Sequence, residues 1–118
     1  MKLSDIGVNS TTVKLLEFER TTNAFNFVFE KDLAANETVI VKMPAVSANK
    51  RGINDIGWVS DAVEGQLALY GTLAKNPKSE KALWQEIRVN DEVNKVTSAL
   101  AVVNSGGACR IEMRAIFN

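Results

Sequence analysis

The 118-residue sequence contains no histidine, one cysteine, two prolines and no long apolar run. Without histidine, a serine or cysteine nucleophile lacks its usual base, and the commonest zinc ligand is missing. The single cysteine, Cys109, excludes an internal disulfide and fits synthesis in a reducing cytoplasm. No apolar stretch approaches the roughly eighteen residues of a membrane-spanning helix, and the first ten residues lack the apolar centre of a secretory signal. We therefore expect neither an enzyme nor a membrane protein, and no cofactor.

Charge of either sign is not in excess, because fourteen basic residues balance fourteen acidic ones. Proteins that bind nucleic acid usually carry a basic excess or a basic stripe. The local clusters at 50–51 and 75–81 are short, and the second is interrupted by Asn, Ser and Glu. We therefore expect no nucleic-acid partner.

Alternation with a period of two is the strongest pattern that is present. In residues 25–30, FNFVFE, the three phenylalanines fall on one face of a strand. In residues 108–117, ACRIEMRAIF, the cysteine and the apolar residues alternate with Arg110, Glu112 and Arg114. NSGG at 104–107, directly before this last segment, is a hairpin signal. It predicts that the final strand pairs with residues 97–103.

Further strand candidates follow at spacings of about ten residues, which is typical of a sandwich or a barrel. They are residues 13–19, 37–43, 56–60, 66–73 and 82–87. Together with the segments above they predict an all-β fold: a single compact β-sandwich of about eight strands over residues 13–118, preceded by an N-terminal arm at residues 1–12.

Residues 79–89 fit two kinds of local structure. As a helix, Ser79 would cap it, and Leu83 and Ile87 would share a face. As a strand, each face of residues 82–87 would contain one polar residue, so the local pattern does not decide. The mediocre helix formers that follow at 90–98 favour the strand.

The second half of the chain has the order of features found in a known kind of protein. A strand ending in Gly-Thr is followed by a polar excursion, a tryptophan-bearing strand, and a Gly-Gly turn before a final alternating strand. In this order residues 58–117 resemble small virion proteins of tailed bacteriophages. The residues that carry the resemblance are Gly71, Thr72, Trp84, Gly106 and Gly107. One departure is the excursion KNPKSEKA, which is longer and richer in lysine than the Asn-Asp-Gly turn frequent in that family.

The resemblance implies a jelly-roll-like sandwich on the surface of a virion. The expected function is that of a capsid decoration or cement protein, made in the host cytoplasm, that bridges subunits of the major capsid protein of a phage head. We expect a homo-oligomer, trimer or dimer, because decoration proteins tend to sit on symmetry axes and zero net charge gives little repulsion between copies. The expected contact residues lie in the arm and in the irregular stretch at 44–55, and they are Leu3, Ile6, Val8, Lys50, Arg51, Ile53 and Asn54.

Other functions are conceivable on particular residues. Trp58, Tyr70 and Trp84 could form a stacking platform for sugars, as in a host-recognition module of a tail fibre or spike, although packing in the core is the better explanation of these residues. Three carboxylates near 55–64 could bind calcium, but their spacing lacks the alternating pattern of calcium-binding loops. Asp61 is better explained as the start of a turn. The glutamates at positions 17, 19 and 30 are best explained as exposed residues of strands, so we expect no metal and no catalytic pair.

Overall fold

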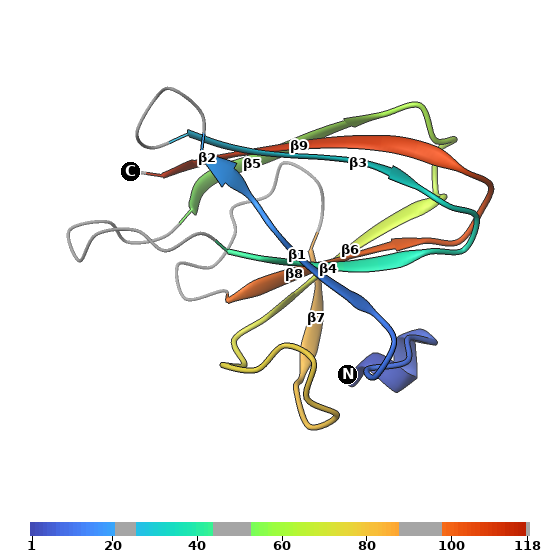
Figure 1. The fold of residues 1–118 in the computed structure, drawn as a ribbon, viewed down its shortest axis with the longest axis vertical. Helices are drawn as coiled ribbons and strands as arrows, with labels where there is room; N and C mark the ends of the chain where they lie inside the picture. Colours follow the sequence, from blue (N-terminus) through green and yellow to red (C-terminus); the bar gives the residue numbers. More distant parts are fainter. Residues whose placement is uncertain (21–25, 44–52, 88–97, 118) are drawn as a thin grey trace.

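The computed structural model describes residues 1–20, 26–43, 53–87 and 98–117, and it is an all-β sandwich of two sheets (Figure 1). Its described part contains nine strands and one short 3-10 helix. The elements are η1 Leu3–Ile6, β1 Lys14–Glu17, β2 Glu19–Arg20, β3 Asn26–Leu33, β4 Thr38–Lys42, β5 Ile53–Ser60, β6 Leu67–Thr72, β7 Trp84–Ile87, β8 Ala99–Asn104 and β9 Cys109–Phe117.

The strand order is that of a jelly roll. One sheet has the order β1-β4-β8-β6-β7 and the other β2-β3-β9-β5. Without β1 and β2, the order β4-β8-β6-β7 facing β3-β9-β5 matches seven of the eight strand positions of two interleaved Greek keys, and every pair is antiparallel. The eighth position, beside β5, belongs in chain order between β7 and β8, where residues 88–97 lie outside the described part of the chain. The jelly-roll-like sandwich is therefore confirmed.

The strand expected at residues 13–19 is divided between the two sheets. β1 pairs in parallel with β4, and β2 pairs antiparallel with β3. Between them the chain crosses at Phe18, whose ring is buried 6.1 Å from that of Phe29 in an edge-to-face arrangement. This crossing joins the two sheets at one side of the sandwich, because a single segment supplies an edge strand to each of them (Figure 1).

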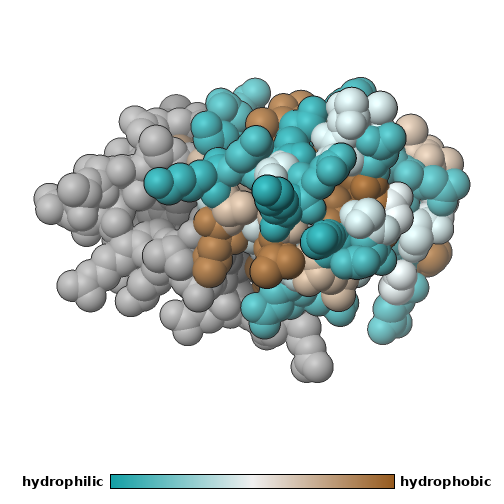
Figure 2. All heavy atoms as spheres, turned by 90° about the horizontal axis from the view of Figure 1, so that it is seen from below, coloured by the Kyte–Doolittle hydropathy of each residue, from teal (hydrophilic) through white to brown (hydrophobic). Residues whose placement is uncertain are grey.

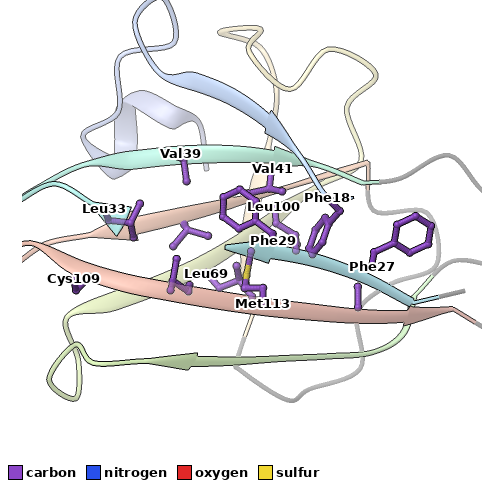
Figure 3. Close-up of a cluster of buried hydrophobic side chains, with 13 residues drawn as sticks. Phe18, Phe27, Phe29, Leu33, Val39, Val41, Leu69, Leu100, Cys109 and Met113 are labelled. Carbon is purple, nitrogen blue, oxygen red and sulfur yellow. The ribbon is translucent and has the colours of Figure 1, made fainter. Parts of the chain in front are cut away.

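The main core lies between the sheets and follows the alternation of the sequence (Figure 3). β9 contributes its cysteine and its apolar residues from Ile111 to Ala115, while Arg110 and Arg114 are exposed. β3 contributes Phe27 and Phe29, as predicted. Phe25 lies outside the described residues.

The expected hairpin between the last two strands is wrong. β8 lies in the five-stranded sheet and β9 in the four-stranded one, so the turn at 105–108 crosses from one sheet to the other. Neither Gly106 nor Gly107 has a positive φ. Gly106 is instead required by close approach, because a Cβ there would lie 2.7 Å from side-chain carbons of Gln66.

The expected free N-terminal arm is also wrong. Residues 1–13 cover the outer face of the five-stranded sheet, where Leu3 and Val8 are buried in a second cluster with Ile40 and Trp84. This cover explains why residues 99–102 of β8 are fully buried although their side chains alternate between the two faces of the sheet. The physical reason is that the outer face of this sheet is itself apolar and would otherwise be exposed to water.

Candidate interaction surface

The contact residues expected from the sequence do not form one surface. Leu3 and Val8 are buried and Ile6 is half-buried, so the arm offers little apolar area to a partner. Lys50 and Arg51 lie outside the described residues. Ile53 and Asn54 belong to β5, but their side chains lie outside the described part.

Two leucines at the far end of β6 and β7 are exposed instead. The last cross-strand pair of these strands is Thr72 opposite Trp84, so Leu73 and Leu83 follow as neighbours on the two antiparallel chains. They are 61% and 67% exposed, respectively. The side chain of Thr72 holds this junction, because its hydroxyl donates to the Leu83 carbonyl at 2.7 Å and accepts from the Ala74 N–H at 3.2 Å.

The connection that links these leucines is ordered by its own hydrogen bonds. The Asn76 carbonyl accepts from the Ser79 N–H, and the Ser79 carbonyl accepts from the Ala82 N–H, each at 3.1 Å. Pro77, the second proline of the chain, is buried within it. The polar excursion of the sequence is therefore neither a helix nor a tight hairpin. The strand expected at residues 82–87 is confirmed from Trp84 to Ile87, while residues 82 and 83 belong to the connection.

Exposed lysines border the two leucines. Lys75 follows Leu73 by two residues and Lys81 precedes Leu83 by two, and both are exposed. We call Leu73, Leu83, Lys75 and Lys81 the leucine patch. The end of the molecule with this connection faces the viewer in Figure 2, where apolar residues lie next to one another among hydrophilic ones. One sign of this patch is local, because Leu73 directly follows Thr72 and Leu83 directly precedes Trp84.

The outer face of the four-stranded sheet carries a network of exposed ion pairs. Arg110 contacts Glu30 at 3.0 Å and Asp32 at 3.2 Å, and Arg114 contacts Glu112 at 2.8 Å. The hydrogen bond that Arg110 donates to Asp32, together with the negative charge of that carboxylate, raises the pKa of Arg110 above its ordinary value. Glu30 is thus an ion-pair partner of this guanidinium on an exposed face of the sheet.

The carboxylate of Asp61 also has a structural partner. It accepts a hydrogen bond at 2.8 Å from the N–H of Arg110, at the start of β9. The expected bond from Asp61 to its own turn is replaced by this longer-range one. Among the described residues, no group of three or more cysteine, aspartate or glutamate side chains is placed to hold a metal ion.

The aromatic residues proposed as a sugar platform do not lie together on the surface. Trp84 is 2% exposed and belongs to the cluster beneath the N-terminal segment. Trp58 is half-buried against the main core, and Tyr70 packs half-buried against the second cluster. Packing therefore accounts for all three.

Comparisons with known proteins return no match: no family model, no curated protein and no solved structure matches this chain. None of the helices in the described ranges is long and apolar enough to cross a membrane.

Proposed function

We propose that this protein is a structural virion protein that decorates the head of a tailed bacteriophage and stabilises it by bridging capsid subunits. Two lines of support are independent of each other. The order of features in residues 58–117 resembles small phage virion proteins, and the strand order is that of the jelly roll, an architecture common in viral capsid and lectin domains. Because a fold alone does not determine function, the proposal depends on the surface.

The observation that carries the proposal is the leucine patch. Large apolar side chains that are exposed on an ordered connection, side by side and rimmed by charge, are typical of a protein contact. Here the two leucines are each more than 60% exposed and are held in place by the hydroxyl of Thr72. The lysines favour an acidic surface on the partner, because complementary charge directs association and sets its orientation.

The proposed mechanism is burial of surface without a chemical step. A stable specific interface buries about 1,200–2,000 Å² in total. Contacts at this patch and at an adjoining subunit would link neighbouring capsid proteins, so that separating them would expose apolar area to water. A homo-oligomer, trimer or dimer, would repeat the patch around a symmetry axis of the shell.

The glycan-binding alternative has less support. It requires an exposed aromatic platform, whereas the aromatic side chains proposed for it are buried or half-buried. A glycan array with the purified protein would revive this alternative if it showed selective binding.

The test is sedimentation of the protein with purified heads of the phage that encodes it. The double variant L73S/L83S removes the apolar part of the patch, and V59S/V63S is its matched control, because those valines are 74% and 73% exposed elsewhere. We expect the native chain and the control to sediment with heads, and L73S/L83S to remain in solution. Equal binding by all three proteins would show that the leucine patch is not part of the contact with heads. No binding by any of them would overturn the decoration function.

A further inference from the structure

Among the described residues, one edge of the four-stranded sheet has no strand beside most of its length. β2 is only two residues long and pairs with Phe27 and Val28 of β3. From Phe29 to Leu33, β3 has its partner β9 on one side and no described strand on the other. The residues that precede β2 would extend this pairing along β3, but they belong to β1 and pair with β4 in the other sheet.

The backbone of this stretch presents hydrogen-bonding groups to the open side. The Nζ of Lys31 lies 3.4 Å from the carbonyl oxygen of Asp32, so this carbonyl points away from β9. Main-chain groups alternate in direction along a strand, and Glu30 therefore presents its N–H and C=O on the same side as Asp32. Such a row of groups is a template for an added strand.

A hollow of about 720 Å³ lies beside this edge. Leu16, Phe18 and Phe29 form part of its apolar lining, where β1 crosses to β2. Glu17 and Glu19 also line it; both are exposed, and neither has an ion-pair partner among the described residues. The opening therefore combines an apolar floor with a rim that is mostly negative.

We infer that this edge accepts an extended segment of a partner protein in which apolar and basic residues alternate. The segment would lie along β3 from Phe29 to Leu33, exchange main-chain hydrogen bonds with Glu30 and Asp32, and place its basic side chains near Glu17 and Glu19. Alternation follows from strand geometry, since successive side chains would point into the hollow and towards the rim. The inference does not depend on the partner's being a capsid protein.

In the free protein the side chain of Lys31 covers part of this edge, at the carbonyl of Asp32. Its ammonium lies 3.8 Å from Glu37, and its side chain is only 21% exposed. Lysines placed in this way commonly protect edge strands from unwanted pairing. The incoming segment would displace this side chain from the Asp32 carbonyl, and the negative rim would favour segments that supply cations of their own.

The test uses a synthetic nine-residue peptide, KVKVTVKVK, and the full chain. We expect binding by isothermal titration calorimetry, with slower hydrogen exchange at the amides of Glu30 and Asp32 in the complex. The variant E17Q/E19Q should weaken binding about fivefold, because each lost surface pair is worth up to a few fold. The matched control E64Q/E86Q changes two exposed glutamates elsewhere and should bind like the native chain.

Two further peptides separate strand addition from simple charge attraction. EVEVTVEVE keeps the alternation but reverses the charge, and KVKVPVKVK keeps the charge but breaks the strand, because proline lacks the N–H. We expect neither to slow exchange at Glu30. The inference is overturned if KVKVTVKVK does not bind, if it binds E17Q/E19Q as tightly as the native chain, or if the amides of Glu30 and Asp32 stay unprotected.

Discussion

Met1 and Trp84 exchange two main-chain hydrogen bonds. The Met1 amino group donates to the Trp84 carbonyl at 2.8 Å, and the Trp84 N–H donates to the Met1 carbonyl at 2.6 Å. The start of the chain thus pairs with the edge strand β7 before it covers the outer face of the sheet. The N-terminal segment is therefore part of the fold rather than a docking arm.

Deletion of residues 1–10 should destabilise the protein. It would remove the buried side chains of Leu3 and Val8 and expose Ile40 and Trp84 beneath them. Two buried aliphatic side chains contribute about 3–6 kcal/mol as an upper estimate. Urea unfolding followed by circular dichroism should show a lower midpoint for the truncated chain. An unchanged midpoint would show that residues 1–10 do not stabilise the fold and would support the interpretation as a free arm.

A single substitution tests the same packing with less disruption. Leu3 is 1% exposed, so Leu3→Ala should lower the free energy of unfolding by about 2–5 kcal/mol. Leu73→Ala removes the same atoms from an exposed position and should change it by no more than about 0.5 kcal/mol. Equal effects of the two variants would contradict the buried position of Leu3.

Asn104 is expected to be the most sensitive polar position. Its side chain is buried and donates to the carbonyls of Ala34 and Gly107, at 2.9 and 3.0 Å, while its oxygen accepts from Gln66 and Gly106. These bonds tie three connections together at one end of the sandwich. Asn104→Ala should therefore lower the free energy of unfolding by about 2–4 kcal/mol, measured by urea unfolding.

The variant Asn104→Asp should make stability depend on pH. A carboxylate there would face two carbonyl oxygens, so the folded state favours the protonated acid and raises its pKa above the unfolded value of about 3.9. Between the unfolded and the folded pKa, the folded state binds more protons than the unfolded state. The free energy of unfolding of the variant therefore falls as pH rises through this interval. Unfolding at pH 4 and pH 7 should show the variant closer to the native chain at pH 4. The opposite trend would contradict the network.

The sequence predicted most strands because alternation is a local property. The faces of β3 and β9 follow directly from the period of two in residues 26–33 and 109–115. Which strands pair is not local, and this is where the expectations were wrong. NSGG looked like a hairpin turn, but the residues before it are apolar on both faces, which is a sign of a central strand covered on both sides.

The interaction surface was less accessible to sequence reasoning. Leu3 and Val8 resembled docking residues because no local pattern shows that residues 1–10 are the segment that covers the apolar outer face of the five-stranded sheet. Leu73 and Leu83 lie ten residues apart, and only the pairing of β6 with β7 brings them together. The gap beside β3 likewise results from the change of sheet at Phe18, which no local pattern indicates.

Cys109 should react slowly with a thiol reagent in the native state. Its side chain is 8% exposed, opposite Leu33 in the register of β3 and β9. The reagent therefore reaches the sulfur only when this end of the sandwich opens. The variant Ser105→Cys, with Cys109 replaced by Ala, provides an exposed thiol in the adjacent turn and should react at once. Equally fast reaction of the native protein would place the thiol at the surface.

Lys31→Ala should leave the fold intact and make the edge of β3 more adhesive. The ion pair with Glu37 is long, at 3.8 Å, and pairs of this kind contribute about 0–1 kcal/mol, so the unfolding midpoint should change little. Loss of the ammonium uncovers the Asp32 carbonyl, and an unguarded strand edge pairs with other chains. Sedimentation velocity should show concentration-dependent association beyond any that the native chain shows under the same conditions. Lys2→Ala removes an equal charge from an exposed site away from both this edge and the leucine patch, and it should not associate. If the two variants behave alike, general charge loss and not the open edge controls association.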